Sequence, residues 1–193
     1  MERTEEDVPP IPIAIQTIGK GYKSLIAPYG MIRHPLWNLA QECGYDIAIG
    51  YNNATIMQGA DVFTFSIKDA PKAAKEFFLH FGCSVEDFDL VSIHQANKLI
   101  VDNVAKRIKA PKEKVQISLD RYGNTRGAST ALNICDYAEQ QKIYSGMKNI
   151  FNLAFGIGLN ITAASFALDM SCCLPSIKTT EVFDDGITNH TYF

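Results

Sequence analysis

The chain has 193 residues, of which 47% are hydrophobic and 20% charged, and its formal net charge is −3. That length and apolar content suffice for one domain with a substantial core, whereas the negative charge argues against broad nucleic-acid binding, which depends on basic surface. No apolar run approaches the roughly 20 residues that a membrane-spanning helix needs, so we expect a protein that binds neither nucleic acid nor membrane.

The first 50 residues predict an arm followed by irregular chain. Residues 1–10 are acidic and end in two prolines, which is typical of a flexible arm. The stretch from Ile11 to Ile18 predicts an edge strand, because it contains Pro12 and proline is confined mostly to sheet edges. Residues 19–51 contain repeated glycine and proline. So long an irregular stretch inside a domain indicates either a function or packing against another part of the protein.

Apolar residues then recur at helical spacing in three groups, with short apolar strands between them, which predicts a layered α/β fold. Pro71 is tolerable in the first turn of the first helix. The groups are Ala70, Ala73, Ala74, Phe77, Phe78 and Phe81; Ala96, Ile100, Val104 and Ile108; and Ala128, Ala131, Leu132, Cys135 and Ala138.

His94 and Asn124 each follow an apolar strand, which we predict at Leu90–Ile93 and Val115–Leu119. In open α/β sheets, ligands bind where strands end and helices begin, because free N–H groups and loop side chains converge there. Each residue also has an ordinary structural interpretation. A histidine after a buried strand is often a hydrogen-bonded structural group, and Tyr-Gly-Asn is common turn chemistry. Their combination favours a functional interpretation.

Near the C-terminus, the sequence predicts a hairpin that is buried on both faces. Residues 149–154 form its first strand, Phe155-Gly156-Ile157-Gly158 its turn, and residues 159–168 its second strand. A glycine-rich turn can bring backbone N–H groups close to a ligand, as the stabilisation of an oxyanion requires. Alternatively, the glycines only allow the bend.

Three motifs follow one another in the second half of the chain. They are His94-Gln95-Ala96-Asn97, Leu119-Asp120-Arg121-Tyr122-Gly123-Asn124-Thr125 and Ala154-Phe155-Gly156-Ile157-Gly158-Leu159. They resemble the signatures of the C-terminal half of β-ketoacyl-acyl carrier protein synthase III, a condensing enzyme with the thiolase fold. Asn124 follows His94 by 30 positions, as in that family. The resemblance covers residues 54–169 and implies a thiolase-like half, with a layered mixed β-sheet packed with helices.

The resemblance also implies a Cys-His-Asn mechanism. In the family, a cysteine of the N-terminal half is acylated, and the enolate of a decarboxylated malonyl thioester attacks the acyl group. His94 and Asn124 would donate to the malonyl thioester carbonyl, and Ile157 would offer a backbone N–H to the other oxyanion. Phe155 would shape the pocket beside the departing carboxylate. Asn97, one turn into a helix, would hydrogen-bond within the site or position Asn124.

Other matching positions imply binding surfaces. Gly59, Val62 and Phe63 correspond to positions that line the family's pantetheine tunnel, although Phe63 also fits a core position. The family's helix begins at Gly59, so we predict a helix there in spite of a strand-like local pattern. Lys106 and Arg107 correspond to positions that hold acyl carrier protein, with a solvated last helical turn as the alternative. Acyl-CoA and malonyl-acyl carrier protein would be the substrates, with no tightly bound cofactor and no metal.

Three positions depart from the family's pattern. Ile157 replaces a glycine, so its N–H remains but its freedom to adopt positive φ does not. Arg126 stands where a small residue is common, and it either pairs with an anionic group in the pocket or is a solvated loop residue. Leu99 stands where the family often has an arginine that docks the carrier protein.

The cysteines show neither metal-ligand spacing nor the setting of a nucleophile. There are five, at Cys43, Cys83, Cys135, Cys172 and Cys173. Their odd number, with no signal peptide, is typical of a reducing compartment, so we expect a cytoplasmic protein.

We divide the chain into three segments. Residues 1–50 are an arm with a remnant of the N-terminal half and its crossover, residues 51–169 are the thiolase-like C-terminal domain, and residues 170–193 are an extension. We expect an acyltransferase of fatty acid or related biosynthesis whose nucleophilic cysteine lies in a missing N-terminal half. The isolated chain would be inactive and the full enzyme a homodimer. Alternatively, the chain is a complementing or noncatalytic subunit that binds acyl or carrier ligands.

Overall fold

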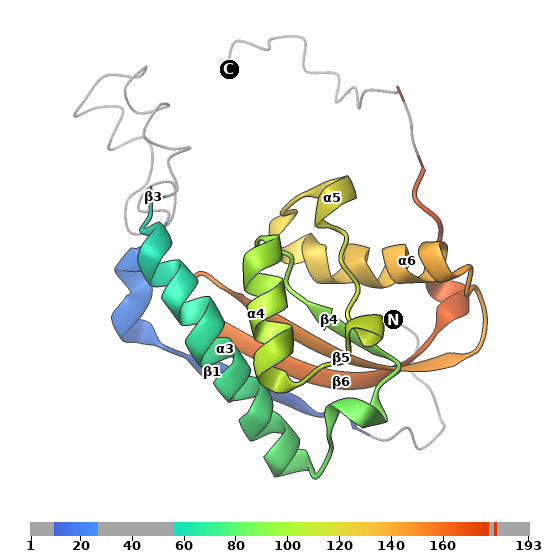
Figure 1. Cartoon of the computed structure of the whole chain (residues 1–193), viewed down its shortest axis with the longest axis horizontal. Coiled ribbons are helices and arrows are strands. Elements are labelled where there is room, and N and C mark those ends of the chain that lie inside the picture. The colour runs from blue at the N-terminus through green and yellow to red at the C-terminus, as the bar shows by residue number, and fades with distance from the viewer. Residues whose placement is uncertain (1–9, 27–55, 178–179, 181–193) are drawn as a thin grey trace.

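The computed structural model describes residues 10–26, 56–177 and 180 (Figure 1). The predicted arm up to residue 9, Cys43 and most of the predicted irregular stretch lie outside these residues. The same holds for the C-terminal extension beyond residue 177, apart from Thr180.

A four-stranded mixed sheet with the strand order β1-β6-β5-β4 forms the centre of the fold. β6 pairs antiparallel with both β1 and β5, whereas β4 pairs parallel with β5. Gly156 lies opposite Asn160 at the tip of the β5–β6 pair, which confirms the predicted hairpin. A second, two-stranded sheet joins β2 to β3. The strands are β1 (Ile13–Thr17), β2 (Leu25–Ile26), β3 (Ile56–Met57), β4 (Leu90–Ile93), β5 (Met147–Gly156) and β6 (Asn160–Asp169).

Helices cover both faces of the four-stranded sheet. Alternate residues of a strand point to opposite faces, and in β4 Val91 packs into one buried cluster and Leu90 into the other. α3 (Gly59–Phe81) and α4 (Lys98–Ile108) cover the first face and lie side by side across it (Figure 1). α6 (Ser129–Gln141) covers the second face. This three-layer arrangement confirms the predicted α/β class.

α3 is one continuous helix of 23 residues, which confirms the choice of helix over the strand-like pattern near its start. Pro71 lies in the middle of the helix, so its predicted place in a first turn is wrong. Proline lacks an N–H and removes one helical hydrogen bond. The helix continues because Ala70, Ala74 and Phe77 around it are almost fully buried against the sheet. The apolar packing outweighs the lost bond.

The predicted strand at Val115–Leu119 is wrong. Only Val115 makes a strand-like bridge, to Val91, and α5 (Leu119–Tyr122) begins where the strand was expected to end. The side chain of Gln95 makes the hydrogen bonds that a neighbouring strand would otherwise make. Its oxygen accepts from the N–H of Ser118 at 3.1 Å, and its amide nitrogen donates to the carbonyl of Gln116 at 3.4 Å. The backbone groups of this segment are therefore satisfied without a neighbouring strand.

The predicted apolar stripe on α6 is only partly correct. Ala138 is fully buried, but Ala131 is exposed, and the fully buried positions include Asn133 and Asp136. The helix is therefore rotated relative to the apolar pattern. This rotation is possible because both polar side chains find hydrogen-bond partners under the helix.

β1 confirms the predicted edge strand. Pro12 stands just before it, and its carbonyl accepts from the N–H of Ser165 at 3.1 Å, so no N–H is needed at that position. β1 completes the same sheet as β4, β5 and β6, although our division at residue 50 places it in a different segment. No helix in residues 10–26 and 56–177 has both the length and the apolar character needed to cross a bilayer.

Candidate active site

His94 directly follows β4. Its N–H donates to the carbonyl of Leu153 at 2.8 Å, which extends the parallel pairing of β4 and β5 by one residue. The four residues of β4 are fully buried, so the strand holds the backbone of His94 rigidly at the end of the sheet. The side chain itself is half-buried.

The imidazole of His94 is packed between two side chains. Its Nδ1 atom lies 2.6 Å from the Oγ atom of Ser129, the first residue of α6. The ring of Phe155 meets it edge-on, with 5.3 Å between the ring centroids. Burial lowers the pKa of His94 below its usual 6.5, because the charged form loses its hydration. The neutral ring is therefore the main form at neutral pH.

The structure brings Phe155 and His94 together and adds Ser129. Nothing in the sequence marks Ser129, since a serine at the start of a helix is ordinarily a capping residue. Its contact with His94 joins positions 35 residues apart. Only the packing of α6 against β4 creates this contact.

Asn124 lies in the loop between α5 and the short helix Arg126–Ala128. Its side-chain oxygen accepts from the N–H of Arg126 at 2.9 Å, which is the turn chemistry that the sequence indicates as the alternative. The same side chain is exposed, and its Nδ2 group donates to no protein atom in the described part of the chain. The turn therefore fixes the oxygen and leaves the two N–H donors of the amide available.

Asn97 caps a helix. It directly precedes α4, and its side-chain oxygen accepts from the N–H of Ile100 at 2.8 Å. The expected position one turn inside the helix is therefore wrong, because the bend after His94 delays the start of α4 to Lys98. Asn97 is exposed, and its side chain has no hydrogen bond to His94 or Asn124.

Ile157 stands at the tip of the β5–β6 hairpin and is 57% exposed. Its carbonyl accepts from the side-chain amide of Asn160 at 2.9 Å. Gly158 has a positive φ of 136°, a backbone conformation that glycine adopts easily and a β-branched residue such as Ile157 does not. The N–H of Ile157 thus lies in a turn in which Gly158 supplies the positive φ.

A buried polar cluster holds the loop of Asn124 against α6. Asp136 has no exposed side-chain surface, and it accepts from Arg121 through Nε at 2.8 Å and Nη2 at 2.5 Å. Gln116 donates to the same carboxylate at 2.5 Å. Asn133 donates to the carbonyl of Gln116 at 3.2 Å and to Oγ of Ser92 at 3.3 Å. No pattern in the sequence indicates this cluster, because its members come from separate segments.

The residues expected to line a pantetheine tunnel lie in the first turns of α3. Gly59 is exposed, and Val62 and Phe63 are half-buried. Phe63 also packs against the core of the α3–α4 face, in agreement with its alternative interpretation. The start of α3 is tied to the preceding segment, because Ser24 donates to the carboxylate of Asp61 at 3.1 Å.

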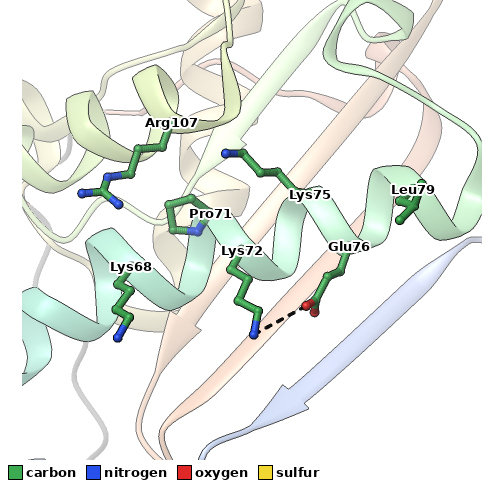
Figure 2. Close-up of a pocket in the computed structure, with 7 residues that line it drawn as sticks. All are labelled: Lys68, Pro71, Lys72, Lys75, Glu76, Leu79 and Arg107. Atoms are coloured by element: carbon green, nitrogen blue, oxygen red, sulfur yellow. Dashed lines mark ion pairs between the residues drawn. The ribbon is translucent and has the colours of Figure 1, made fainter.

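A basic groove of about 320 Å³ runs between α3 and α4 (Figure 2). Arg107 lines it from α4, and Lys68, Lys72 and Lys75 line it from α3. Among these side chains, in the described residues, only Lys72 forms an ion pair, with Glu76 at 3.8 Å. Lys106 does not line the groove, although it precedes Arg107 in the last turn of α4. Of these four basic side chains, the sequence predicts a binding role only for Arg107.

Two of the cysteines that the structure describes, Cys83 and Cys173, are poor nucleophiles. Burial raises the pKa of Cys83, and the nearby Asp87 raises it further. Burial, with Cys135 and Cys172 close by, raises the pKa of Cys173 to about 12. A thiol with a raised pKa carries little of the reactive thiolate at neutral pH.

The sequence of this region matches a family profile described as 3-oxoacyl-(acyl-carrier-protein) synthase III C terminal, over residues 80–168. Residues 80–168 are a synthase III C-terminal domain. The domain contains α4, α6, β4, β5 and all of β6 except its last residue. Both His94 and Asn124 lie within it.

Two relatives of the chain are named as synthase III enzymes. A β-ketoacyl-(acyl-carrier-protein) synthase III of Caldanaerobacter subterraneus subsp. tengcongensis is 35% identical over 141 residues, which are 73% of this chain and 40% of that protein. The synthase III of Fusobacterium nucleatum subsp. nucleatum is 38% identical over 107 residues, 55% of this chain and 32% of that protein. The chain therefore spans less than half the length of these relatives.

A solved structure shares the fold of the synthase III domain. The priming β-ketosynthase of the R1128 polyketide biosynthetic pathway superposes with a TM-score of 0.69 at 27% identity, over 85% of this chain and 46% of that one. This similarity confirms the predicted thiolase-like half, with its mixed sheet packed between helices.

Proposed function

We propose that this chain supplies the decarboxylation side of a condensing enzyme of the synthase III type. The observation that carries the proposal is the setting of His94, a neutral ring at the end of a buried strand and edge-on to Phe155, within a domain of that family. The full enzyme is then an acyltransferase of fatty acid or related biosynthesis in the cytoplasm.

The proposed reaction is a decarboxylative Claisen condensation. The bond between the malonyl methylene carbon and its carboxylate breaks, carbon dioxide leaves, and the electron pair moves onto the thioester oxygen as an enolate. Hydrogen bonds from His94 and Asn124 stabilise this oxygen as its charge develops. The enolate carbon then attacks an acyl thioester on a cysteine, and the cysteine leaves as a thiolate.

The remaining predicted residues act around this pair. Phe155 fills the wall beside His94 and excludes water from the departing carboxylate. The N–H of Ile157 binds the oxyanion that forms on the acyl group. Asn97 acts through α4, whose first turn it caps at the edge of the site.

The nucleophile is proposed to lie on an N-terminal half that precedes this domain in the relatives. Two observations support this: the chain spans less than half of its curated relatives, and Cys83 and Cys173 have raised pKa values. A second arrangement is a separate subunit that contributes the cysteine and completes the site, or a noncatalytic partner subunit. The full enzyme is proposed to be a homodimer.

Malonyl-acyl carrier protein and acyl-CoA are the proposed substrates, with no tightly bound cofactor. Lys106 and Arg107 would hold the acidic carrier protein by charge complementarity, and the lysines of the basic groove extend the same cationic surface along α3 (Figure 2). Gly59, Val62 and Phe63 would line the path of the pantetheine arm.

The test adds to the chain an N-terminal half that carries the proposed nucleophile. The chain is assayed alone and after fusion to the N-terminal half of the Caldanaerobacter subterraneus synthase III, with release of labelled carbon dioxide from malonyl-acyl carrier protein as the measurement. We expect condensation from the fusion and none at a useful rate from the isolated chain, because covalent catalysis lacks its nucleophile. Acylation and turnover by the isolated chain would contradict the proposed division of the site.

A further inference from the structure

We propose that the hydroxyl of Ser129 donates its hydrogen to Nδ1 of His94 and thereby keeps the ring hydrogen of the neutral imidazole on Nε2. Ser129 is then a positioning residue that decides which nitrogen of His94 is a hydrogen-bond donor. The mechanistic meaning of this inference rests on the proposed function, whereas the hydrogen-bond assignment stands on the structure.

Only one placement of the hydrogens between Ser129 and His94 gives the buried hydroxyl of Ser129 an acceptor. Ser129 is 1% exposed, and among the described residues the only hydrogen-bond partner of its Oγ atom is Nδ1 of His94, at 2.6 Å. If Nδ1 carried the ring hydrogen, Oγ would accept it and the hydroxyl hydrogen would have no acceptor. Buried donors are rarely left without a partner. Donation from Ser129 to a bare Nδ1 avoids this cost.

Ser129 does not use its hydroxyl to cap its helix. A serine in the first turn of a helix often bonds a free backbone N–H there, but α6 has no side-chain cap, and the Oγ atom of Ser129 faces His94 instead. The start of α6 is held against β4 by Ser92, whose Oγ donates to the carbonyl of Thr130 at 3.3 Å. The hydroxyl is therefore fixed beside the ring.

The chemical consequence concerns the free nitrogen of the ring. In neutral histidine, one nitrogen donates and the other accepts, and the partner of one decides the state of the other. With Nδ1 occupied by the Ser129 hydrogen, Nε2 carries an N–H. An enolate oxygen needs such a donor, whereas a lone pair on Nε2 would repel it.

The direct test is nitrogen NMR on the 15N-labelled 193-residue chain above the pKa of His94. We expect a pyridine-type shift for Nδ1 and a pyrrole-type shift for Nε2, with the His94 signals assigned by their loss in His94→Gln. The reverse pattern would overturn the inference. This measurement needs neither an active enzyme nor a change at Ser129.

Substitutions then separate positioning from general stability. Ser129→Ala is expected to produce a mixture of the two tautomers, and Ser129→Thr, which keeps the hydroxyl, to retain the wild-type pattern. Ser66→Ala is the matched control, because Ser66 is fully buried and, within the described part of the chain, its hydroxyl bonds only the carbonyl of Val62 in α3. An unchanged tautomer in Ser129→Ala would also refute the inference.

In the fused enzyme, Ser129→Ala should lower kcat by about 10- to 100-fold, as loss of a histidine's orienting partner does elsewhere, and Ser129→Thr should restore most of the activity. If the NMR pattern is as expected and the fused enzyme is inactive, the proposed function fails while the assignment of Ser129 stands. If the fused enzyme is active and Nδ1 carries the hydrogen, the assignment fails alone.

Discussion

At the scale of single residues, the proposed chemistry centres on His94, which the fold keeps half-buried and largely neutral. A neutral imidazole can donate through one nitrogen without the charge that would attract the substrate's carboxylate. Burial makes the neutral state the stable one by lowering the pKa of His94, while Ser129 and Phe155 pack against the ring. The same features lead to two predictions.

The first prediction concerns stability and pH. The pKa of His94 is lowered in the folded state relative to 6.5, so below pH 6.5 the unfolded chain binds a proton that the folded chain does not. This contribution therefore destabilises the fold as pH falls through 6.5 toward the folded pKa, and it levels off below that pKa. Urea unfolding across this range should show the loss in the wild type. His94→Gln should lack this part of the pH dependence, and identical profiles would contradict the prediction.

The second prediction concerns the donor pair in the fused enzyme. His94→Ala and Asn124→Ala should each reduce condensation on the order of 10²-fold, since each removes a donor to a developing oxyanion. Asn103→Ala is the control: this asparagine is on α4, and among the described residues its side chain bonds only the carbonyl of Leu99. Steady-state rates with malonyl-acyl carrier protein measure the effect. Full activity of both variants would refute their assignment.

At the scale of secondary-structure elements, α6 and the preceding loop depend on a buried ion pair. Asp136 has no exposed side-chain surface, whereas its partner Arg121 is 33% exposed. Asp136 also accepts from Gln116, so one carboxylate joins α6 to the segment between α4 and α6. The pair therefore fixes the loop that carries Asn124 to the helix that carries Ser129.

We accordingly expect Asp136→Asn to destabilise the fold by about 2 kcal/mol, because it leaves the guanidinium without its main charge-assisted partner. Asp120→Asn removes the exposed carboxylate on the same arginine, which lies 2.7 Å from Nη1, and should cost less than about 0.5 kcal/mol. Denaturant unfolding of the two variants measures the difference. Equal effects would show that burial of the pair is not decisive.

The basic groove leads to a prediction at the same scale. Lys68, Lys75 and Arg107 have no carboxylate partner among the described residues, so their charges are available to an acidic protein. Changing all three to Glu in the fused enzyme should raise KM for malonyl-acyl carrier protein by at least about 10-fold at low salt, with little change in kcat. The difference should shrink at high salt, because added ions screen exposed charges.

The matched control changes the net charge equally at other exposed positions, namely Lys20, Lys112 and Lys142, each to Glu. If both triple variants raise KM alike, the effect comes from net charge and the groove is not the docking surface.

At the scale of the whole molecule, the described residues form three layers with two apolar clusters. α3 and α4 cover one face of the sheet. The start of α6 adjoins both loops of the predicted pair, because Ser129 contacts His94 and the loop that carries Asn124 leads into this helix. The relatives are more than twice as long as the region they share with this chain. In the proposed catalyst, this chain holds the donors and another part of the enzyme supplies the nucleophile.

Local patterns were sufficient for the features that depend on neighbours in the chain. The apolar spacing of residues 70–81 predicts α3, and the glycine turn at 156–158 predicts the β5–β6 hairpin. The strand before His94 is likewise evident, because four apolar or small residues in a row fit a strand buried on both faces. Helix and strand periodicity are encoded within a few residues, so they can be recognised in the sequence without knowledge of the fold.

Patterns failed where a side chain replaced a regular element. Gln95 satisfies the backbone at 116 and 118, so no strand forms there, and Asn97 ends the loop as a cap. α6 turns Asp136 inward although its apolar residues lie elsewhere, because Arg121 provides a partner. At Gln95 and Asp136, a specific hydrogen bond between distant positions outweighs the local preference.

The sequence by itself determined the family resemblance, the α/β class and the pair His94 and Asn124, since motif order and spacing are properties of the chain alone. Only the tertiary structure decided what surrounds that pair. It places the hydroxyl of Ser129 on Nδ1 of His94 and joins the lysines of α3 to Arg107 of α4. These contacts depend on how α6 packs on β4 and α3 on α4, which no local pattern in the sequence encodes.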